Sequence, residues 1–198
     1  MKQLLVGLVA VVLFSLPAWA QPSDQQGDVA FAVGSLFTPS ASDASGNYSA
    51  QSMGGGAYLT FSGDYLFYRH FGIGSEVSWR ASRNDYGGYQ PYRPIFYDVN
   101  AVYSPPLGKH AQVELLGGMG GVSTHFYSQY YACNYFVCSN YSSVNHFDGD
   151  VGAGIKLFLH GGVFLRPEFR EYFIKHNYEF SSGHATRADV ALGYTFGR

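Results

Sequence analysis

Residues 187–196 read R-A-D-V-A-L-G-Y-T-F, and this stretch decides the fold because its side chains alternate in polarity. One parity is wholly apolar and the other is polar or small; the two sets are Val190, Leu192, Tyr194 and Phe196, against Asp189, Ala191, Gly193 and Thr195. Successive side chains of a β-strand point to opposite faces, so a strand built here has one apolar face. A water-soluble sheet covers such a face with a second layer, whereas a membrane barrel turns it toward lipid. We therefore predict that this stretch is the closing strand of a small outer-membrane barrel.

The same alternation recurs upstream in seven further segments, each at least ten residues long. Together the eight predicted strands cover residues 28–37, 53–67, 73–82, 95–104, 111–124, 146–159, 163–174 and 187–196. A tilted strand needs about 9–11 residues to cross a bilayer. The sequence thus predicts an all-β fold, an eight-stranded antiparallel up-and-down transmembrane barrel.

The connections between these segments alternate in length. Long polar connections at residues 38–52, 83–93, 125–145 and 175–186 alternate with short ones at 68–72, 105–110 and 160–162. Short periplasmic turns and long outer loops are typical of outer-membrane barrels with both ends of the chain inside. A soluble sandwich or lipocalin-type barrel has no reason to sort its loops in this way.

Three features interrupt the pattern. Pro167 lies in the middle of a segment, where it removes a hydrogen-bond donor from the strand ladder. Glu171 falls on the lipid-facing parity, which either a register-shifting bulge near Pro167 or a position among the lipid headgroups would explain. The glycines of residues 117–121 indicate a bulge or a tight bend in the wall.

The first twenty residues have the composition of a cleavable signal peptide. Lys2 precedes an apolar run at residues 4–16, and Ala18 and Ala20 form a small-residue cleavage site before Gln21. A transmembrane helix needs about 20 apolar residues, and this run is shorter and ends at Pro17. We expect residues 1–20 to be removed on export and residues 21–198 to form one outer-membrane barrel domain.

Composition agrees with a barrel but does not separate a membrane barrel from a soluble one. Aromatic residues make up 18% and charged residues only 13% of the chain. Loss of Lys2 with the signal peptide leaves 11 basic against 14 acidic residues, a formal charge of −3. No basic surface for nucleic acid is expected.

The two cysteines, Cys133 and Cys138, are five positions apart in the longest predicted loop. An exported chain meets an oxidising compartment, so we predict a local disulfide between them. Two thiols without a neighbouring histidine pair make half a zinc site, and no metal or other cofactor is expected.

The polar parity of the segments carries a mixed set of charged residues. A predicted ion-pair network in the barrel interior comprises Asp64, Glu76, Arg80, Asp98, Glu114, Asp148, Asp150, Lys156, Arg166, Glu168, Arg170 and Asp189. Buried charges must be paired, and an eight-stranded barrel is only wide enough to be filled by side chains. A gated conduction path or an acid/base site is the sharper alternative.

Four histidines, His125, His146, His176 and His184, lie near the predicted outer loop bases. A lipid hydrolase or acyltransferase needs a nucleophile, a base and an orienting group. No spacing links these histidines into such a triad and no G-x-S-x-G occurs, so no catalytic residue is assigned and polar rim positions are expected.

Aromatic side chains are dense in the longest loop. The predicted contact surface comprises Tyr127, Tyr130, Tyr131, Tyr135, Phe136 and Tyr141. Tyrosine offers a large contact area at low entropic cost, so a disulfide-stapled loop of this kind suits binding. A mobile loop or an interfacial aromatic girdle is the alternative.

Three stretches resemble those of small outer-membrane barrels: HFGIGSEVSW at residues 70–79, LRPEFR at 165–170 and ALGYTF at 191–196. Over the mature chain, the sequence is similar to the eight-stranded barrels grouped with the OmpA-like transmembrane domain and OmpX-type proteins. It most resembles the outer membrane protein beta-barrel domain family of Gram-negative bacteria. The resemblance implies insertion by the barrel-assembly machinery, which reads an aromatic-ended final strand, although Gly197 and Arg198 follow Phe196 here. No peptidoglycan-binding domain is expected.

We therefore expect a non-enzymatic outer-membrane barrel with a structural or surface-interaction role. Its expected partners are outer-membrane lipid, the barrel-assembly machinery and a surface ligand bound by the loops, and it is expected to be a monomer. The first alternative is a soluble periplasmic lipocalin-like barrel that binds an apolar ligand. The second is an outer-membrane lipid-modifying enzyme or a narrow porin.

Overall fold

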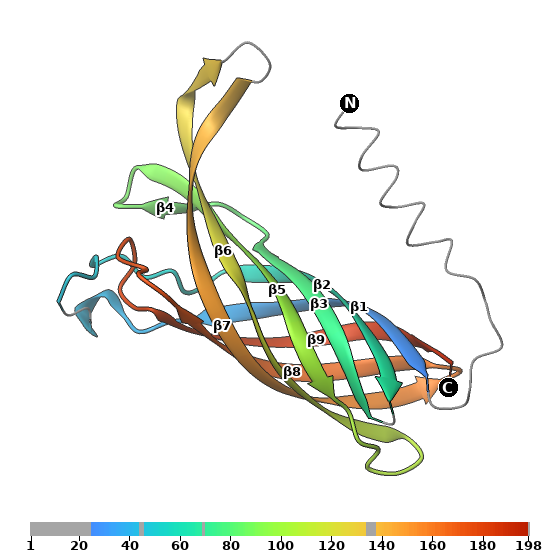
Figure 1. Cartoon of the computed structure of the whole chain (residues 1–198). Coiled ribbons are helices and arrows are strands. Elements are labelled where there is room, and N and C mark those ends of the chain that lie inside the picture. Colours follow the sequence, from blue (N-terminus) through green and yellow to red (C-terminus); the bar gives the residue numbers. More distant parts are fainter. Residues whose placement is uncertain (1–24, 44–45, 69, 134–137, 198) are drawn as a thin grey trace.

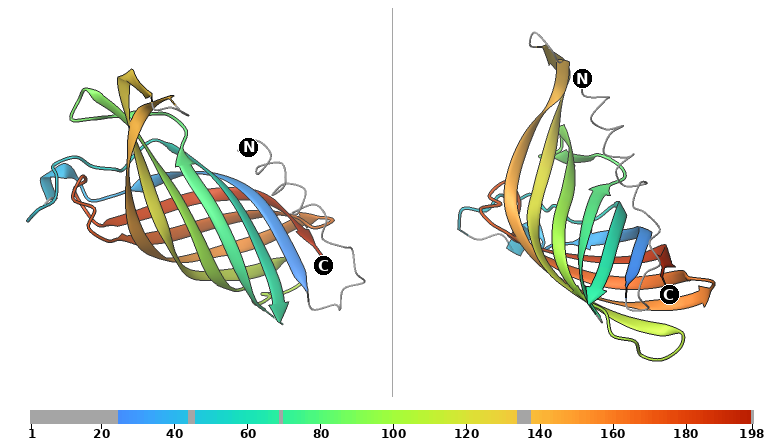
Figure 2. Two further views of the ribbon diagram at one scale, coloured as in Figure 1. Left: turned by 45° about the horizontal axis from the view of Figure 1, so that its top comes forward. Right: turned by 45° about the vertical axis from the view of Figure 1, so that its right-hand side comes forward.

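The computed structural model describes residues 25–43, 46–68, 70–133 and 138–197, and they form a closed antiparallel barrel (Figures 1 and 2). Its strands are β1 (Gln26–Phe37), β2 (Ala57–Tyr68), β3 (Phe71–Arg80), β4 (Asn84–Tyr86), β5 (Gln90–Tyr103), β6 (Ala111–Cys133), β7 (Cys138–His160), β8 (Val163–Ile174) and β9 (His184–Phe196). The strand order is β3-β2-β1-β9-β8-β7-β6-β5-β4, and pairing of β3 with β5 closes a ring of eight long strands. The predicted fold class is confirmed.

The apolar parity of each strand faces outward. Leu192, Phe169 and Val151 are 57%, 65% and 52% exposed. Residues of the opposite parity, such as Asp150 and Arg166, are buried inside the ring. A lipocalin-type barrel requires the reverse arrangement, so the soluble ligand-binding alternative is wrong. Within the described residues the helical element is the short 3₁₀ turn η1 (Ala41–Asp43), and no helix is long and apolar enough to cross a membrane.

The short turns lie at the same end of the barrel as the start of β1 and the end of β9, and the long connections lie at the other end (Figure 1). The turn between β7 and β8 uses Gly161 and Gly162, with φ of 54° and 92°. Glycine adopts this left-handed region without steric cost, which allows a two-residue hairpin. The predicted sorting of the connections by length is present in the fold.

The outer end contains more strand than the sequence predicts. An irregular loop is expected at residues 125–145, but β6 and β7 are 23 residues each and continue through this region as a hairpin that projects from the barrel (Figures 1 and 2). Their register shifts between Tyr127 and Ala132. Within the expected loop 83–93, β4 pairs with the start of β5. Backbone pairing therefore continues where the apolar alternation has ended.

The glycines of residues 117–121 do not form a bulge. β6 keeps one register with β5 and β7 throughout this stretch. Gly118 and Gly120 lie on the inward parity, and a Cβ on Gly120 would collide with the backbone oxygen of Tyr97. These glycines therefore allow close approach of β5 to β6.

Pro167 does not shift the register either. The pairing of β8 with β9 is continuous through Pro167, which lies opposite Val190, and the pairings of Gly154 with Glu168 and Leu157 with Leu165 share one register. Glu171 therefore remains on the outward parity, near the outer end of β8, and accepts a hydrogen bond from the Thr186 hydroxyl. The bulge explanation is wrong.

Candidate functional site

The barrel interior is built from charge. Nine carboxylates and five cationic side chains of the described residues are buried there. They include the whole predicted set of twelve, together with Asp28 and Arg187, which the prediction omitted. Asp28 and Arg187 share the inward parity of their strands, so the alternation itself carries the signal for both.

The inner ionic cluster, nearest the short-turn end, comprises Asp28, Asp64, Glu114, Lys156 and Arg166. Lys156 is fully buried, and its Nζ contacts the carboxylates of Asp28 and Glu114, with Asp64 at 4.0 Å. Arg166 contacts Glu114 and lies 3.2 Å from Asp64. β1, β2, β6, β7 and β8 contribute one residue each. The inner ionic cluster therefore ties distant parts of the ring together.

The outer ionic cluster is centred on Arg170. Its guanidinium lies 2.9 Å from Asp98, 3.0 Å from Glu168, 3.2 Å from Glu76 and 3.3 Å from Asp150. These four carboxylates come from β3, β5, β7 and β8. A planar guanidinium with five donors suits several carboxylates at once, which explains an arginine at this position.

Arg187 and Glu168 connect the two clusters. Arg187 contacts Glu76 and lies 2.7 Å from Asp189, and its Nη1 donates to the Tyr172 hydroxyl at 2.6 Å. Glu168 faces Arg166 at 3.1 Å and Arg187 at 3.5 Å, as well as Arg170. One chain of ion pairs therefore runs along the barrel interior from the inner cluster to the outer one.

Two members of the predicted set stand outside this chain. Within the described residues Arg80 forms no ion pair, and its Nη1 donates to the Tyr92 hydroxyl at 3.3 Å. Asp148 is 1% exposed, yet its carboxylate has neither an ion pair nor a hydrogen bond among the described residues. The sequence pattern indicates that both face inward, but it does not identify their partners.

Apolar side chains close the outer end of the interior. The cluster there comprises Leu36, Met53, Tyr58, Tyr92, Phe96, Val122, Phe126, Tyr172, Ile174, Phe180 and Ala185. Met53 and Phe180 come from the connections after β1 and β8, and both are almost fully buried. The two connections are joined by a hydrogen bond from the Ser181 amide to the Gln51 carbonyl at 2.7 Å. Packed side chains therefore fill this end of the barrel, which gives no support to a conduction path.

The projecting part of β6 and β7, which we call the outer hairpin (residues 125–133 and 138–145), carries most of the predicted contact surface. Tyr130 and Tyr131 are 83% and 70% exposed, and Tyr141 is also exposed. The Arg83 guanidinium lies 3.6 Å from the ring centre of Tyr127, which is a cation–π distance. The predicted positions Tyr135 and Phe136 lie outside the described residues.

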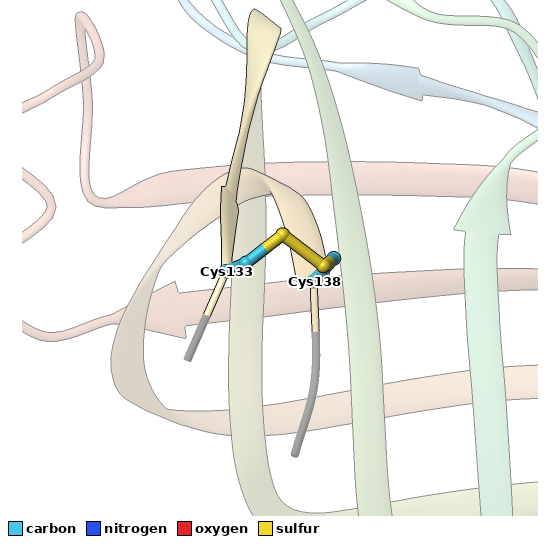
Figure 3. Close-up of a disulfide and its surroundings, with 2 residues drawn as sticks. All are labelled: Cys133 and Cys138. Atoms are coloured by element: carbon cyan, nitrogen blue, oxygen red, sulfur yellow. A yellow bond between two sulfur atoms is a disulfide. The ribbon is translucent and has the colours of Figure 1, made fainter. Parts of the chain in front are cut away.

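The predicted disulfide between Cys133 and Cys138 is present and joins the two strands of the outer hairpin near its tip (Figure 3). These cysteines lie directly opposite each other in the β6–β7 register. The cross-link restricts the opening of a two-stranded ribbon that lacks the second layer of a packed sheet.

The histidines are separated around the outer end. His125 stacks on Tyr141, with ring centres 4.4 Å apart, and burial and the nearby Arg93 lower the pKa of His125. His146 Nε2 lies 2.8 Å from Glu179, and His184 Nδ1 lies 3.6 Å from Glu171. The His176 ring lies 5.7 Å from that of Tyr178, measured between ring centres. Each histidine thus has its own neighbours at the rim.

Among the described residues, one group of three or more histidine, cysteine or acidic side chains has the spacing of a metal site, namely Asp28, Asp64 and Glu114. Lys156 and Arg166 already form ion pairs with these three carboxylates. No described histidine therefore belongs to a group with metal-site spacing, and the acidic group is explained as part of the inner ionic cluster.

A closed ring of eight strands with an apolar exterior and a charged interior defines a small outer-membrane barrel. The comparison with protein families agrees, since residues 6–196 match the family described as outer membrane protein beta-barrel domain. The chain belongs to this family, and the predicted resemblance is confirmed. Family and fold together indicate an outer-membrane location. No curated protein matches the sequence.

Solved structures with the same fold include three outer-membrane proteins. Neisserial surface protein A is 9% identical, with a TM-score of 0.61, covering 87% of this chain and 97% of that one. A major outer membrane protein of Thermus thermophilus is 12% identical, with a TM-score of 0.55 and coverage of 86% and 99%. The attachment invasion locus protein Ail of Yersinia pestis, solved with the heparin analogue sucrose octasulfate, is 13% identical, with a TM-score of 0.53 and coverage of 87% and 97%. At these identities the likeness concerns the fold alone.

Proposed function

We propose that this protein is a non-enzymatic outer-membrane barrel whose outer hairpin makes contacts at the cell surface. The carrying observation is the 23-residue length of both β6 and β7, which exceeds what a membrane crossing requires. The additional length of these two strands places exposed aromatic side chains beyond the barrel wall. The ion-paired interior acts as a rigid scaffold for this surface.

Several features of the outer hairpin support a contact role. Tyr130 and Tyr131 are among the most exposed large side chains of the described residues, and rigid aromatic groups provide contact area at low entropic cost. The disulfide limits the freedom of the tip, so less entropy is lost on binding. Two proteins of the same fold carry names that refer to the cell surface or to attachment.

The proposal includes the route to the membrane. Residues 1–20, which lie outside the described residues, serve as a cleaved signal peptide, and residues 21–198 form the mature barrel. The barrel-assembly machinery inserts it as a monomer, with lipid against the apolar exterior. The short turns then face the periplasm and the outer hairpin faces the medium.

The test compares surface display with adherence. A tag is inserted after Gly46, in the connection after β1 at the same end of the barrel, so that it leaves the outer hairpin intact. An antibody against this tag should label intact cells, and cells that display the protein should adhere to at least one of immobilised collagen, laminin, fibronectin or heparin. Replacing Tyr130 and Tyr131 by serine should reduce adherence at least severalfold at equal display. Tyr89→Ser is the matched control, because Tyr89 is 80% exposed but lies outside the outer hairpin.

Two results would contradict the proposal. Labelling only after the cells are permeabilised would show that the outer hairpin does not face the medium. Adherence that is unchanged by the double substitution, or absent for the wild-type protein on all four coatings, would remove its contact role.

A further inference from the structure

Four oxygen-bearing side chains form a group beneath the apolar outer end. Asp98 and Asn100 lie on β5, and Asp148 and Asp150 lie on β7, each with an exposed fraction of 5% or less. β6 runs between these strands, and the register places Gly120 between Asp98 and Asp148. Gly118 lies in the same way between Asn100 and Asp150. No side chain of β6 therefore separates the two pairs.

The oxygens of this group are poorly satisfied by the protein. Five of them have no hydrogen-bond partner among the described residues: Asp98 Oδ2, Asn100 Oδ1, Asp148 Oδ1, Asp148 Oδ2 and Asp150 Oδ1. Asp148 is the clearest case, since every other buried carboxylate of the described residues has an ion pair. An unpaired buried carboxylate is strongly unfavourable, so this group calls for a positive partner.

Arg170 does not supply enough positive charge. Arg170 also faces Glu76 and Glu168, but Arg187 pairs with both of these as well. Among the described residues, Asp98 and Asp150 have Arg170 as their ion-pair partner, so one positive charge serves two carboxylates and Asp148 has none. The interior as a whole has nine buried carboxylates and five buried cationic side chains among the described residues. Positive charge is therefore deficient both at Asp148 and in the barrel interior as a whole.

We propose that Asp98, Asn100, Asp148 and Asp150 form a binding site for a hard divalent cation, with Ca²⁺ as the preferred ion. Ca²⁺ takes 6–8 oxygen ligands from carboxylates, amide carbonyls and water in flexible geometry, whereas Mg²⁺ demands near-ideal octahedral coordination. Side chains on separate strands match the less demanding ion. The bound cation links β5 to β7 across the two glycines and stiffens the barrel directly below the outer hairpin.

The acidic group at the inner end is a weaker candidate. Asp28, Asp64 and Glu114 have closer spacing, but Lys156 contacts Asp28 and Glu114, and Arg166 pairs with Asp64. A cation there would have to displace a buried ammonium group. At the site around Asp148, Arg170 Nη1 occupies Asp98 Oδ1 and Asp150 Oδ2, which leaves Asp98 Oδ2, Asp150 Oδ1 and both oxygens of Asp148 free. An ion that binds these free oxygens need not displace Arg170, and water ligands of the ion bridge the wider spacing.

The test measures the calcium content of the folded mature chain. Because packed side chains close the outer end and hinder entry of an ion into the folded barrel, the protein is refolded into detergent micelles in the presence of millimolar Ca²⁺. It is then passed over a chelating resin, and mass spectrometry measures the amount of metal per folded barrel. Heat-modifiable gel mobility gives the folded fraction. We expect about one Ca²⁺ per folded wild-type barrel.

Asp148→Asn should lower the retained Ca²⁺ at least about tenfold, since loss of a supporting group alone typically costs 10–100-fold in metal affinity. Asp43→Asn, a change at an exposed acid of η1, should leave it unchanged. Should Asp148→Asn fail to fold, Asp150→Asn replaces it in the comparison. Folded wild-type protein that retains no Ca²⁺ after the chelating resin would overturn the proposal. It would indicate that protonation of the carboxyl groups, and not a bound cation, removes the unpaired charge. Ca²⁺ retained by the folded variants would overturn it by showing that the ion binds elsewhere.

Discussion

Replacing Lys156 by methionine tests the role of the ionic interior most severely. Lys156 is fully buried, and its ammonium contacts the carboxylates of Asp28 and Glu114. Methionine retains much of the side-chain volume but removes the charge. Asp28 then has no ion pair, because Lys156 is its ion-pair partner among the described residues.

The expected loss is large because a buried charge is left uncompensated. Removing one partner of a buried ion pair costs about 3–5 kcal/mol. We therefore expect Lys156→Met to lower the free energy of unfolding by about this amount. In the double variant Lys156→Met/Asp28→Asn the orphaned carboxylate is also neutralised, so part of the loss should be recovered, with a coupling energy of about 0.5–3 kcal/mol.

Unfolding by urea in lipid vesicles provides the assay, with Trp79 fluorescence as the signal. Trp79 lies on the outward parity of β3, so its emission should change when the strand leaves the bilayer. Lys175→Met is the matched control, because Lys175 is exposed in the connection after β8, and its effect should stay within about 0.5 kcal/mol. A Lys156→Met barrel as stable as the wild type would refute the reasoning that the interior charges depend on one another.

Three further substitutions and one titration probe the wall, the outer hairpin and its histidine. Leu192→Arg, on the lipid face, should cost about 2–4 kcal/mol if the site is near the bilayer midplane, and should reduce the folded fraction in membranes, measured by heat-modifiable mobility. Gly120→Val should destabilise the barrel by at least about 1–3 kcal/mol in urea unfolding, because its Cβ would collide with the backbone oxygen of Tyr97. Cys133→Ser should speed proteolysis of the outer hairpin while the barrel unfolds within about 0.5 kcal/mol of the wild type. The pKa of His125, measured by NMR, should lie below the ordinary value of about 6.5, because the folded hairpin favours the neutral ring. The contribution of His125 to hairpin stability should therefore be complete above about pH 6.5 and be lost as the pH falls through the lowered pKa.

Sequence reasoning predicts the barrel wall well because lipid and interior impose opposite demands on alternate residues. Val190 and Asp189 differ in polarity for this reason, and the period of two identifies both the strand and its lipid face. The rule stops at the edge of the membrane. Tyr127 and Tyr141 pair across the outer hairpin through the backbone ladder, where no lipid enforces alternation, so the sequence predicts a loop where the structure has strand.

The interior is predictable in composition but not in its contacts. Parity places Arg170 and Asp148 inside, yet only the register and tilt of the strands determine which partners they meet. Arg170 pairs with four carboxylates, whereas Asp148 forms neither an ion pair nor a hydrogen bond among the described residues. The outer apolar cluster is harder still, since Met53 and Phe180 come from connections that have no periodicity. Their burial depends on how two distant connections pack together.

The central claim is that the apolar parity of each strand contacts lipid and the charged parity fills a closed interior. Nitroxide labels placed singly at residues 188–194 of β9 in reconstituted vesicles test it directly, by their collision rates with dissolved oxygen and with a water-soluble nickel chelate. We predict high oxygen accessibility at Val190 and Leu192 and low accessibility to both reagents at Asp189 and Ala191. High oxygen accessibility at Asp189 and Ala191, with Val190 and Leu192 shielded, would contradict the account.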